Sequence, residues 1–397
     1  MKAKIFAALL LTVGLLAGCG AEEQPSIPVY EVTPKPIETQ VEESSEETSQ
    51  TEETEETEDL VAEDPIITER VVVDGKMQSY LTGEWKDEEV VRRRSMAVMM
   101  PNNKPALPQY GITKASIVYE APVEGRVTRL MCFVEDYDDL DHIGPVRSAR
   151  DYYVYEAMAY DAIYCNWGLA RPFVEEMINS DRVDNVSQAV AGIYKPAAEA
   201  YDRISRAGYA TEFTGYLFID GYKDAVERLG YETEYRDTFE QAFTFANDGH
   251  RAEYKDQDDA TLIYPGGKES NRGGYSDAKS YFEYNEEDGL YYRYQFGGPH
   301  VDEMNGEQVA VSNVVFKVCH GEVREPSSYD YLAFGVHGEG DAYVFTNGKV
   351  IKGTWERSSD TAANMFYDED GNEIIFNQGK TWICNIWKEY EEYVYYE

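Results

Sequence analysis

The chain has 397 residues and carries 75 acidic against 36 basic side chains, which gives a net charge of −39 at neutral pH. Acidity of this degree excludes a general nucleic-acid-coating protein, because such a surface needs a basic footprint. Any polyanion would therefore have to meet a local cluster of cations, and the length beyond residue 64 favours two domains over one.

The first 19 residues predict a bacterial lipoprotein signal peptide. A lysine-containing start precedes an apolar run over residues 5–16, which has the length of a signal core and is too short to span a bilayer. Small residues then lead to Cys19 in a sequence that resembles a lipobox. We expect Cys19 to be acylated and to hold the protein on the extracytoplasmic face of the membrane. The alternative is an uncleaved apolar helix.

Residues 20–64 are expected to form a disordered acidic linker. They contain 16 Asp and Glu residues and a single lysine, with almost nothing apolar to bury. Repulsion between like charges extends such a chain, so this segment would act as a tether.

Strands and helices alternate in the segment that follows, 65–250. Strands are predicted over residues 95–103, 116–120, 127–135 and 161–168. Helices are predicted over 170–179 and 220–231, and another near Ala149, with Ser148 and Asp151 as a capping box. This pattern predicts an α/β domain with a mixed sheet.

Beyond residue 255 the pattern changes to short alternating strands rich in aromatic residues. Asp288-Gly289, Asn347-Gly348 and Asp370-Gly371 are dipeptides typical of tight hairpin turns. We expect residues 255–397 to form a second, β-rich domain. The many tyrosines could stack on sugars or bases, or could simply pack strand faces.

Four further cysteines, Cys132, Cys165, Cys319 and Cys384, each lie in an apolar, strand-like run without zinc-type spacing. They could form two disulfides in an extracellular protein. The favoured interpretation is four buried free thiols that behave as small hydrophobic side chains.

Several stretches in this order resemble the YerB-type family of Gram-positive cell-surface lipoproteins, which have two paired domains of unassigned function. They include "RRSMAVMMPNN", "GITKASIVYEAPVEGRVTRL", "HIGPVRSARDYY", "YYRYQFGGPHVDEMNGEQV" and "NQGKTWICNIW". The resemblance covers about residues 93–387 and implies a surface lipoprotein without implying a reaction. The chain departs from the family pattern at "WGLARP" and at "RISRAGYATEF", which lacks the His and Asn expected there.

Two arginines in "GPVRSARD" are the sharpest candidates for a ligand site. Arg147 and Arg150 flank Ser148 at a predicted helix start, where free backbone N–H groups already favour an anion. The alternative is structural pairing with Glu120, Glu124 or Asp151, and in so acidic a chain we favour that pairing.

A second candidate is the acid pair Glu120 and Glu124, close to Arg129. Paired carboxylates can perform acid–base chemistry, for example on glycans, but chance pairs are expected in this composition. The histidines show no zinc-type spacing. The acidic loops 136–141 and 368–372 could hold Ca²⁺ through their oxygen ligands, but neither fits the EF-hand pattern, and solvated charge is the favoured interpretation. No metal or cofactor is therefore predicted.

Two functions remain open from the sequence. The first is a lipid-anchored, non-catalytic protein that binds an envelope or extracellular polymer, extracellular DNA or teichoic acid among them, or a protein partner. The second is an envelope enzyme acting on wall glycan or peptide through the acid pair and the arginines. A deep pocket joining those residues would favour the enzyme, and a flat tyrosine-lined face would favour binding. The oligomeric state is not predicted.

Overall fold

A ten-stranded mixed sheet forms the centre of the computed structural model, which describes residues 64–268, 273–324 and 329–397. Its strand order is β22-β21-β20-β17-β24-β4-β5-β3-β7-β8. The first five are β22 (Met365–Asp368), β21 (Lys349–Arg357), β20 (Gly338–Thr346), β17 (Asn313–Cys319) and β24 (Thr381–Trp387). The others are β4 (Ile117–Val123), β5 (Val127–Val134), β3 (Met96–Asn102), β7 (Ile163–Asn166) and β8 (Asn185–Ser187).

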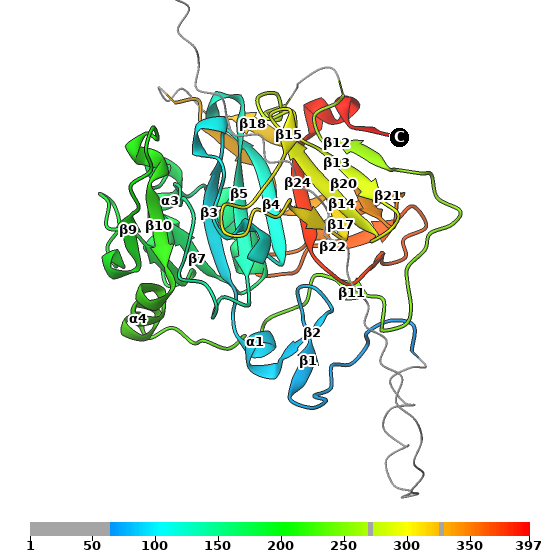
Figure 1. The fold of residues 1–397 in the computed structure, drawn as a ribbon, viewed down its shortest axis with the longest axis horizontal. Coiled ribbons are helices and arrows are strands. Elements are labelled where there is room, and N and C mark those ends of the chain that lie inside the picture. Colours follow the sequence, from blue (N-terminus) through cyan, green and yellow to red (C-terminus); the bar gives the residue numbers. More distant parts are fainter. Residues whose placement is uncertain (1–63, 269–272, 325–328) are drawn as a thin grey trace, which may run out of the picture. The chain divides into compact units, whose positions relative to one another are not determined.

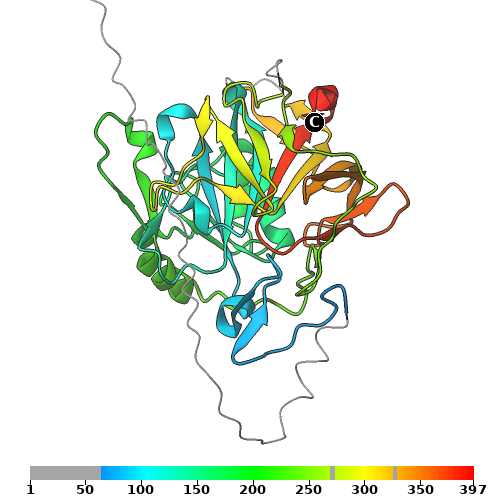
Figure 2. The ribbon, with the colours of Figure 1, turned by 45° about the vertical axis from the view of Figure 1, so that its right-hand side comes forward.

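Strand β24 joins the two predicted segments within this sheet. It pairs in parallel with β4 on one side and with β17 on the other. Figure 2 shows it in red between the blue-green strands of the first segment and the orange strands of the second. Its residues up to Ile386 are buried, as expected for a central strand with both faces covered. The hydrophobic core is therefore continuous from one segment to the other.

The predicted fold class is confirmed: the first segment is α/β with a mixed sheet and the second is rich in β. Strands β3, β7 and β8 run parallel, whereas β3, β5 and β4 are antiparallel. Helix α3 (Arg171–Ile178) connects β7 to β8 as the crossover that a parallel pair needs. Helices α2 (Asp151–Ala159) and α4 (Ile219–Leu229) complete this part, after the short α1 (Glu88–Arg92).

Two layers cover the two faces of the central sheet. Helices α2 and α3 pack on one face (Figure 1). The other face is covered by α4, by the sheet β6-β10-β9 and by a six-stranded sheet of the second segment. The first of these sheets comprises β6 (His142–Ile143), β9 (Tyr201–Arg203) and β10 (Gly215–Phe218). The second comprises β12 (Leu262–Tyr264), β13 (Tyr281–Asn285), β14 (Leu290–Gln295), β15 (Gly298–Pro299), β16 (Ala310–Val311) and β25 (Tyr395–Tyr396).

Three small pairs of strands lie outside these sheets. They are β1 (Lys76–Gln78) with β2 (Trp85–Asp87), β11 (Thr244–Phe245) with β23 (Ile375–Phe376), and β18 (Gly321–Val323) with β19 (Leu332–Phe334).

Two of the predicted hairpin turns are confirmed. Asn347 and Gly348 connect β20 to β21, and both have positive φ, 53° and 71°, as a two-residue type I′ turn requires. Asp288 and Gly289 lie in the turn between β13 and β14. The strand register of both hairpins follows from these turns.

The predicted capping box at Ser148 is wrong. Helix α2 begins at Asp151, its N-cap is Arg150, and no side chain caps it. The backbone before it is extended because it pairs with the loop after β7: the Ala149 N–H donates to the Gly168 carbonyl oxygen at 2.9 Å. That tertiary pairing delays the helix by two residues and leaves its first N–H groups without a side-chain cap.

All four cysteines beyond Cys19 are buried and free, which confirms their predicted burial. Cys19 and most of the acidic linker lie outside the described residues. Within the residues described, no helix is both long and apolar enough to cross a bilayer.

Candidate functional site

The arginine cluster lies where the parallel strands β3 and β7 end. Arg129 on β5 is paired with Pro101 near the end of β3. The segment 147–150 runs past both strands, because the Arg147 N–H donates to Met99 at 2.8 Å and its carbonyl accepts from Trp167 at 3.0 Å. The carboxyl ends of parallel strands are the usual place for a ligand in a sheet of this kind.

Arg150 forms the structural ion pair that the sequence favoured. Its Nη2 lies 2.5 Å from Glu124 Oε2 and its Nε 3.1 Å from Glu124 Oε1, a bidentate contact between two largely buried side chains. Burial alone would raise the pKa of Glu124, but the hydrogen bonds and charge of Arg150 outweigh it and lower that pKa. Asp151 pairs instead with Arg324.

Arg129 is the unbalanced member of the cluster. It is 7% exposed, its Nη1 donates to the Ser148 carbonyl at 2.8 Å, and Arg150 Nη1 approaches the same oxygen at 3.4 Å. Among the described residues no carboxylate forms an ion pair with it, and its buried Nε has no partner. Burial, followed by repulsion from Arg150 and Arg147, lowers the pKa of Arg129 to about 9. Two guanidinium groups therefore converge on the Ser148 carbonyl oxygen, and among the described residues only Arg150 has a carboxylate partner.

Arg147 is the accessible member of the cluster. Its Nη2 lies 2.9 Å from Glu212, whose side chain is half exposed, and its guanidinium lies 5.4 Å from the centre of the Phe213 ring. An exposed pair of this kind contributes little to stability and is easily exchanged for another anion. Ser148 donates from its hydroxyl to the Trp167 carbonyl at 3.4 Å. Arg147 is therefore held at the edge of the cluster by Glu212, whose carbonyl oxygen also accepts from it at 3.2 Å.

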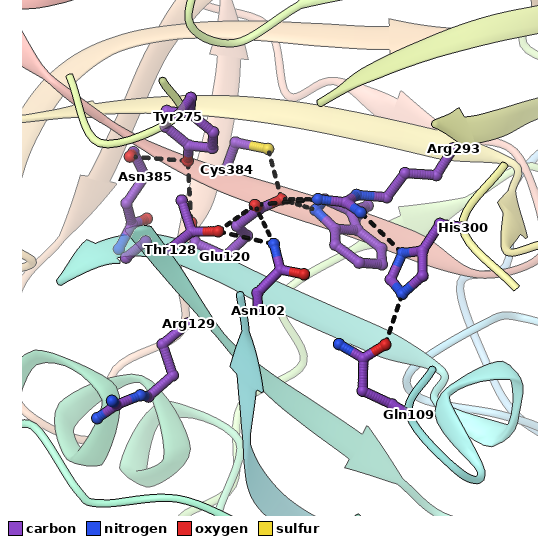
Figure 3. A network of polar contacts seen from close by, with 12 residues as sticks. Asn102, Gln109, Glu120, Thr128, Arg129, Tyr275, Arg293, His300, Cys384 and Asn385 are labelled. Atoms are coloured by element: carbon purple, nitrogen blue, oxygen red, sulfur yellow. Dashed lines mark hydrogen bonds and ion pairs between the residues drawn. The ribbon is translucent and has the colours of Figure 1, made fainter. Parts of the chain in front are cut away.

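Glu120 does not join Glu124 in a common pocket. Its carboxylate is completely buried. Arg293 Nη2, on β14, donates to both carboxylate oxygens at 3.0 Å. It also accepts from Thr128, Asn102 and the Trp382 indole (Figure 3). A carboxylate saturated in this way has no free oxygen for proton transfer, so the geometry does not favour the acid-pair interpretation. Figure 3 also shows Arg129 pointing away from this network.

His300 and Gln109 extend this network, and sequence reasoning missed them together with Arg293. Arg293 Nη1 lies 2.7 Å from His300 Nδ1, and His300 Nε2 lies 2.8 Å from Gln109 Oε1. Since arginine can only donate, Nδ1 accepts and Nε2 carries the proton. Burial, and then the charge of Arg293, hold the pKa of His300 well below its usual range, so the ring is neutral. The one signal in the sequence for this network is Arg293 within an alternating strand, with His300 shortly after it, in a segment rich in aromatic residues.

A second buried network lies on the opposite face of the central sheet. Glu156 on α2 pairs with Lys317 on β17 at 2.8 Å and with Arg357 on β21 at 3.2 Å. Asn364 donates to Glu156 at 2.9 Å and accepts from Lys317 at 2.6 Å. All four side chains are buried. Like the Glu120 network, it connects the two segments, and its four side chains are closed off from solvent.

The carboxylates of the two acidic loops considered for calcium already have partners within the protein. Asp138 pairs with Arg93 and Lys223, both at 2.8 Å, and Asp139 pairs with Lys114. Asp368 accepts from the backbone of its own turn. In the parts of the chain that the structure describes, no group of three His, Cys, Asp or Glu residues is placed to hold a metal ion.

The tyrosines of the six-stranded sheet form a row across its outer face. Tyr264, Tyr281 and Tyr294 lie on adjacent strands, with ring centres 4.9 Å and 4.8 Å apart and nearly parallel planes. The ring faces of neighbouring tyrosines therefore lie against one another, and each tyrosine is partly buried. This arrangement favours strand-face packing over a platform for sugars.

Comparison with known proteins identifies the family. Two family models cover most of the folded chain: "Protein of unknown function (DUF3048) N-terminal domain" matches residues 81–247, and the corresponding C-terminal domain matches residues 272–383. The chain belongs to the DUF3048 family. This result confirms the resemblance seen in the sequence motifs.

A curated relative and a solved structure with a similar fold both come from Bacillus subtilis. The protein described as "Putative lipoprotein YerB" from Bacillus subtilis (strain 168) is 25% identical over 317 residues, which is 78% of this chain and 86% of that protein. The crystal structure of YerB protein from Bacillus subtilis matches with a TM-score of 0.64 at 22% identity. It covers 81% of this chain and 99% of that chain, and so supports the fold.

The two segments "WGLARP" and "RISRAGYATEF" contact each other beside the arginine cluster. Arg203, from "RISRAGYATEF", lies over the Trp167 ring at 4.5 Å from its centre, and Trp167 begins "WGLARP". Trp167 also packs against Gly215, where any side chain would collide with its ring. The segment 203–213 thus contacts Trp167 through Arg203 and Arg147 through Glu212.

Proposed function

We propose that this chain is a lipid-anchored, non-catalytic surface protein that binds an anionic group of an envelope or extracellular polymer at Arg129, Arg147 and Arg150. The single observation that carries this proposal is Arg129, an enclosed cation without a carboxylate partner among the described residues, beside the Arg150–Glu124 pair. A buried cation without a counter-ion is costly, and a bound anion would remove that cost.

The size and charge of the site limit the ligand. Three guanidinium groups suit a phosphate or carboxylate group through bidentate hydrogen bonds. The net charge of −39 repels a long, densely charged polymer, so we favour one or a few anionic groups over a continuous DNA contact. A teichoic acid phosphate is a suitable probe, and the salt dependence should correspond to no more than about three released counterions.

The alternative, an envelope enzyme, has less support. The carboxylate of Glu120 is enclosed by Arg293 and its other donors, and that of Glu124 is occupied by Arg150. Among the described residues, Glu120 and Glu124 have no hydrogen-bond partner in common. Acid–base catalysis needs a carboxyl group within reach of the substrate, and this arrangement does not offer one.

Removing the charge of Arg129 should separate binding from folding. We expect Arg129→Met to abolish binding of teichoic acid, because the site loses its uncompensated cation. The melting temperature should stay the same or rise. Folding buries the charged Arg129 and lowers its pKa, so this charge destabilises the folded state at neutral pH. Binding is measured at two salt concentrations, and stability by thermal melting.

The variant for comparison is Arg150→Ala, which leaves the largely buried Glu124 without its partner. We expect a loss of about 2–4 kcal/mol of stability, with binding reduced in the folded fraction as well. Arg129→Met protein that still binds as wild type does, or wild-type protein that binds no teichoic acid at low salt, would contradict the proposal.

The proposed anchor is tested separately at Cys19. We expect Cys19→Ser to prevent acylation and to move the protein from the membrane fraction to the medium or to an unprocessed precursor. Two acyl chains bury many methylene groups at about 0.8 kcal/mol each, so no partial retention is expected without them. Fractionation and metabolic labelling with a fatty acid measure the result, and a variant that remains labelled and membrane-bound would rule out this anchor.

A further inference from the structure

A small cavity lies between the two family segments, separate from the residues of the arginine cluster. Its volume is about 200 Å³, and its apolar wall includes Ile112, Val118, Val309, Val311 and Trp382. Its polar residues are Thr113, Glu307, Gln308 and Lys380. At about 30 Å³ for each water molecule, the volume corresponds to about seven waters and suits a small organic molecule.

Lys380 supplies the only lysine or arginine among the residues that line this cavity. It directly precedes β24, and its carbonyl oxygen accepts from the backbone of Ser312 at 3.0 Å and Asn313 at 3.1 Å, which fixes its position. Its Nζ donates to the Thr113 carbonyl oxygen. No carboxylate of the described residues lies within ion-pair distance of it, although Glu84 and Glu307 attract it from farther away.

The acidic residue in the cavity is already engaged. Glu307 Oε2 accepts from Asn305 at 2.9 Å. The lysines nearest to the cavity have their own partners, since Lys86 pairs with Glu135 at 2.9 Å and Lys114 with Asp139. Burial, the largest influence, lowers the pKa of Lys380. Among the described residues the ammonium group therefore has no carboxylate in direct contact, and much of the cavity wall beside it is apolar.

We infer that this cavity binds a small organic carboxylate with an apolar body, whose carboxylate group pairs with Lys380. A single ammonium group matches one negative charge, whereas a phosphate would need several donors that the apolar wall does not provide. The aliphatic and aromatic side chains of the wall would cover the apolar body of the ligand. This site and its ligand class are independent of the proposed anion site at Arg129.

Hexanoate and its neutral analogue hexanamide test this inference, since they have nearly the same shape. We expect hexanoate to bind the wild-type protein with a Kd on the order of 1 mM. It should bind about tenfold more tightly than hexanamide, because it adds one charge-assisted contact. Lys380→Met, which keeps the unbranched side chain, should remove that preference. Lys114→Met is the matched control and should preserve it.

A second measurement uses the wild-type protein and so does not depend on whether the variant folds. Hexanoate, but not hexanamide, should slow the acylation of Lys380 by an amine-reactive reagent in the wild-type protein, measured by mass spectrometry relative to Lys114. Equal binding of the two compounds, no detectable hexanoate binding at millimolar concentrations, or unprotected Lys380 would each overturn the inference.

Discussion

Replacing Arg293 with methionine should cost about 3–5 kcal/mol of folding free energy, because the completely buried carboxylate of Glu120 then loses its cation. His300 Nδ1 also loses its donor. The network connects β14 of the second segment to β4 of the first, so its loss should weaken the contact between the segments as well as the core. Denaturant unfolding measures the change.

The double variant Arg293→Met with Glu120→Gln distinguishes ion pairing from simple loss of packing. Removing both charges should recover a large part of the loss, because no buried charge is left alone. Arg92→Met serves as the control, since its contact with Glu88 is a helical pair with Arg92 47% exposed, and less than about 0.5 kcal/mol is expected there. A loss below about 1 kcal/mol for Arg293→Met would show that the pair does not hold the segments together.

The second large effect is expected at Glu156, whose carboxylate serves both Lys317 and Arg357. Glu156→Gln leaves two buried cations unpaired, so we expect a loss of at least about 3–5 kcal/mol. Lys317→Met should cost less, because Arg357 and Asn364 still contact Glu156. The order of the two variants in denaturant unfolding is the test, and the reverse order would contradict this account.

Acid should reveal the same network. Burial would raise the pKa of Glu156, but the attraction of Lys317 and Arg357 outweighs it and the pKa is lowered. A lowered carboxyl pKa gives stability above the unfolded value near 4.5 that is lost as the pH falls below it. Glu156→Gln should lose less stability than wild type between about pH 5 and pH 3, relative to each protein at pH 7. Equal slopes would exclude Glu156 as a source of acid sensitivity.

Several features followed from local sequence alone. The apolar runs at 95–103 and 127–135 became β3 and β5 within a residue or two at each end, and Asn347-Gly348 formed its predicted turn. These succeed because alternation, apolar runs and the positive φ of Gly are properties of neighbouring residues. The family motifs were also local, and they identified the correct family without indicating a reaction.

The helix start at Ser148 failed for a tertiary reason. The extended pairing of Ala149 with Gly168 is formed by residues 19 positions apart, and it prevailed over the local preference for a cap. The arginine cluster was predicted only in part, since Arg147, Arg150 and Ser148 are neighbours in sequence. Arg129 was assigned to the acid pair, because nothing local shows that its side chain meets Arg150 rather than Glu120.

The sequence by itself determined the acidic character, the class of each segment, the buried cysteines and the family. Only the tertiary structure decided that β24 enters the sheet beside β4, that Glu120 pairs with Arg293 and Glu156 with Lys317, and that Lys380 lines a cavity. Each of these depends on residues more than 150 positions apart, or on a cavity enclosed by both segments. Burial in a shared core selects such partners through shape and desolvation, and no pattern of neighbouring residues specifies them.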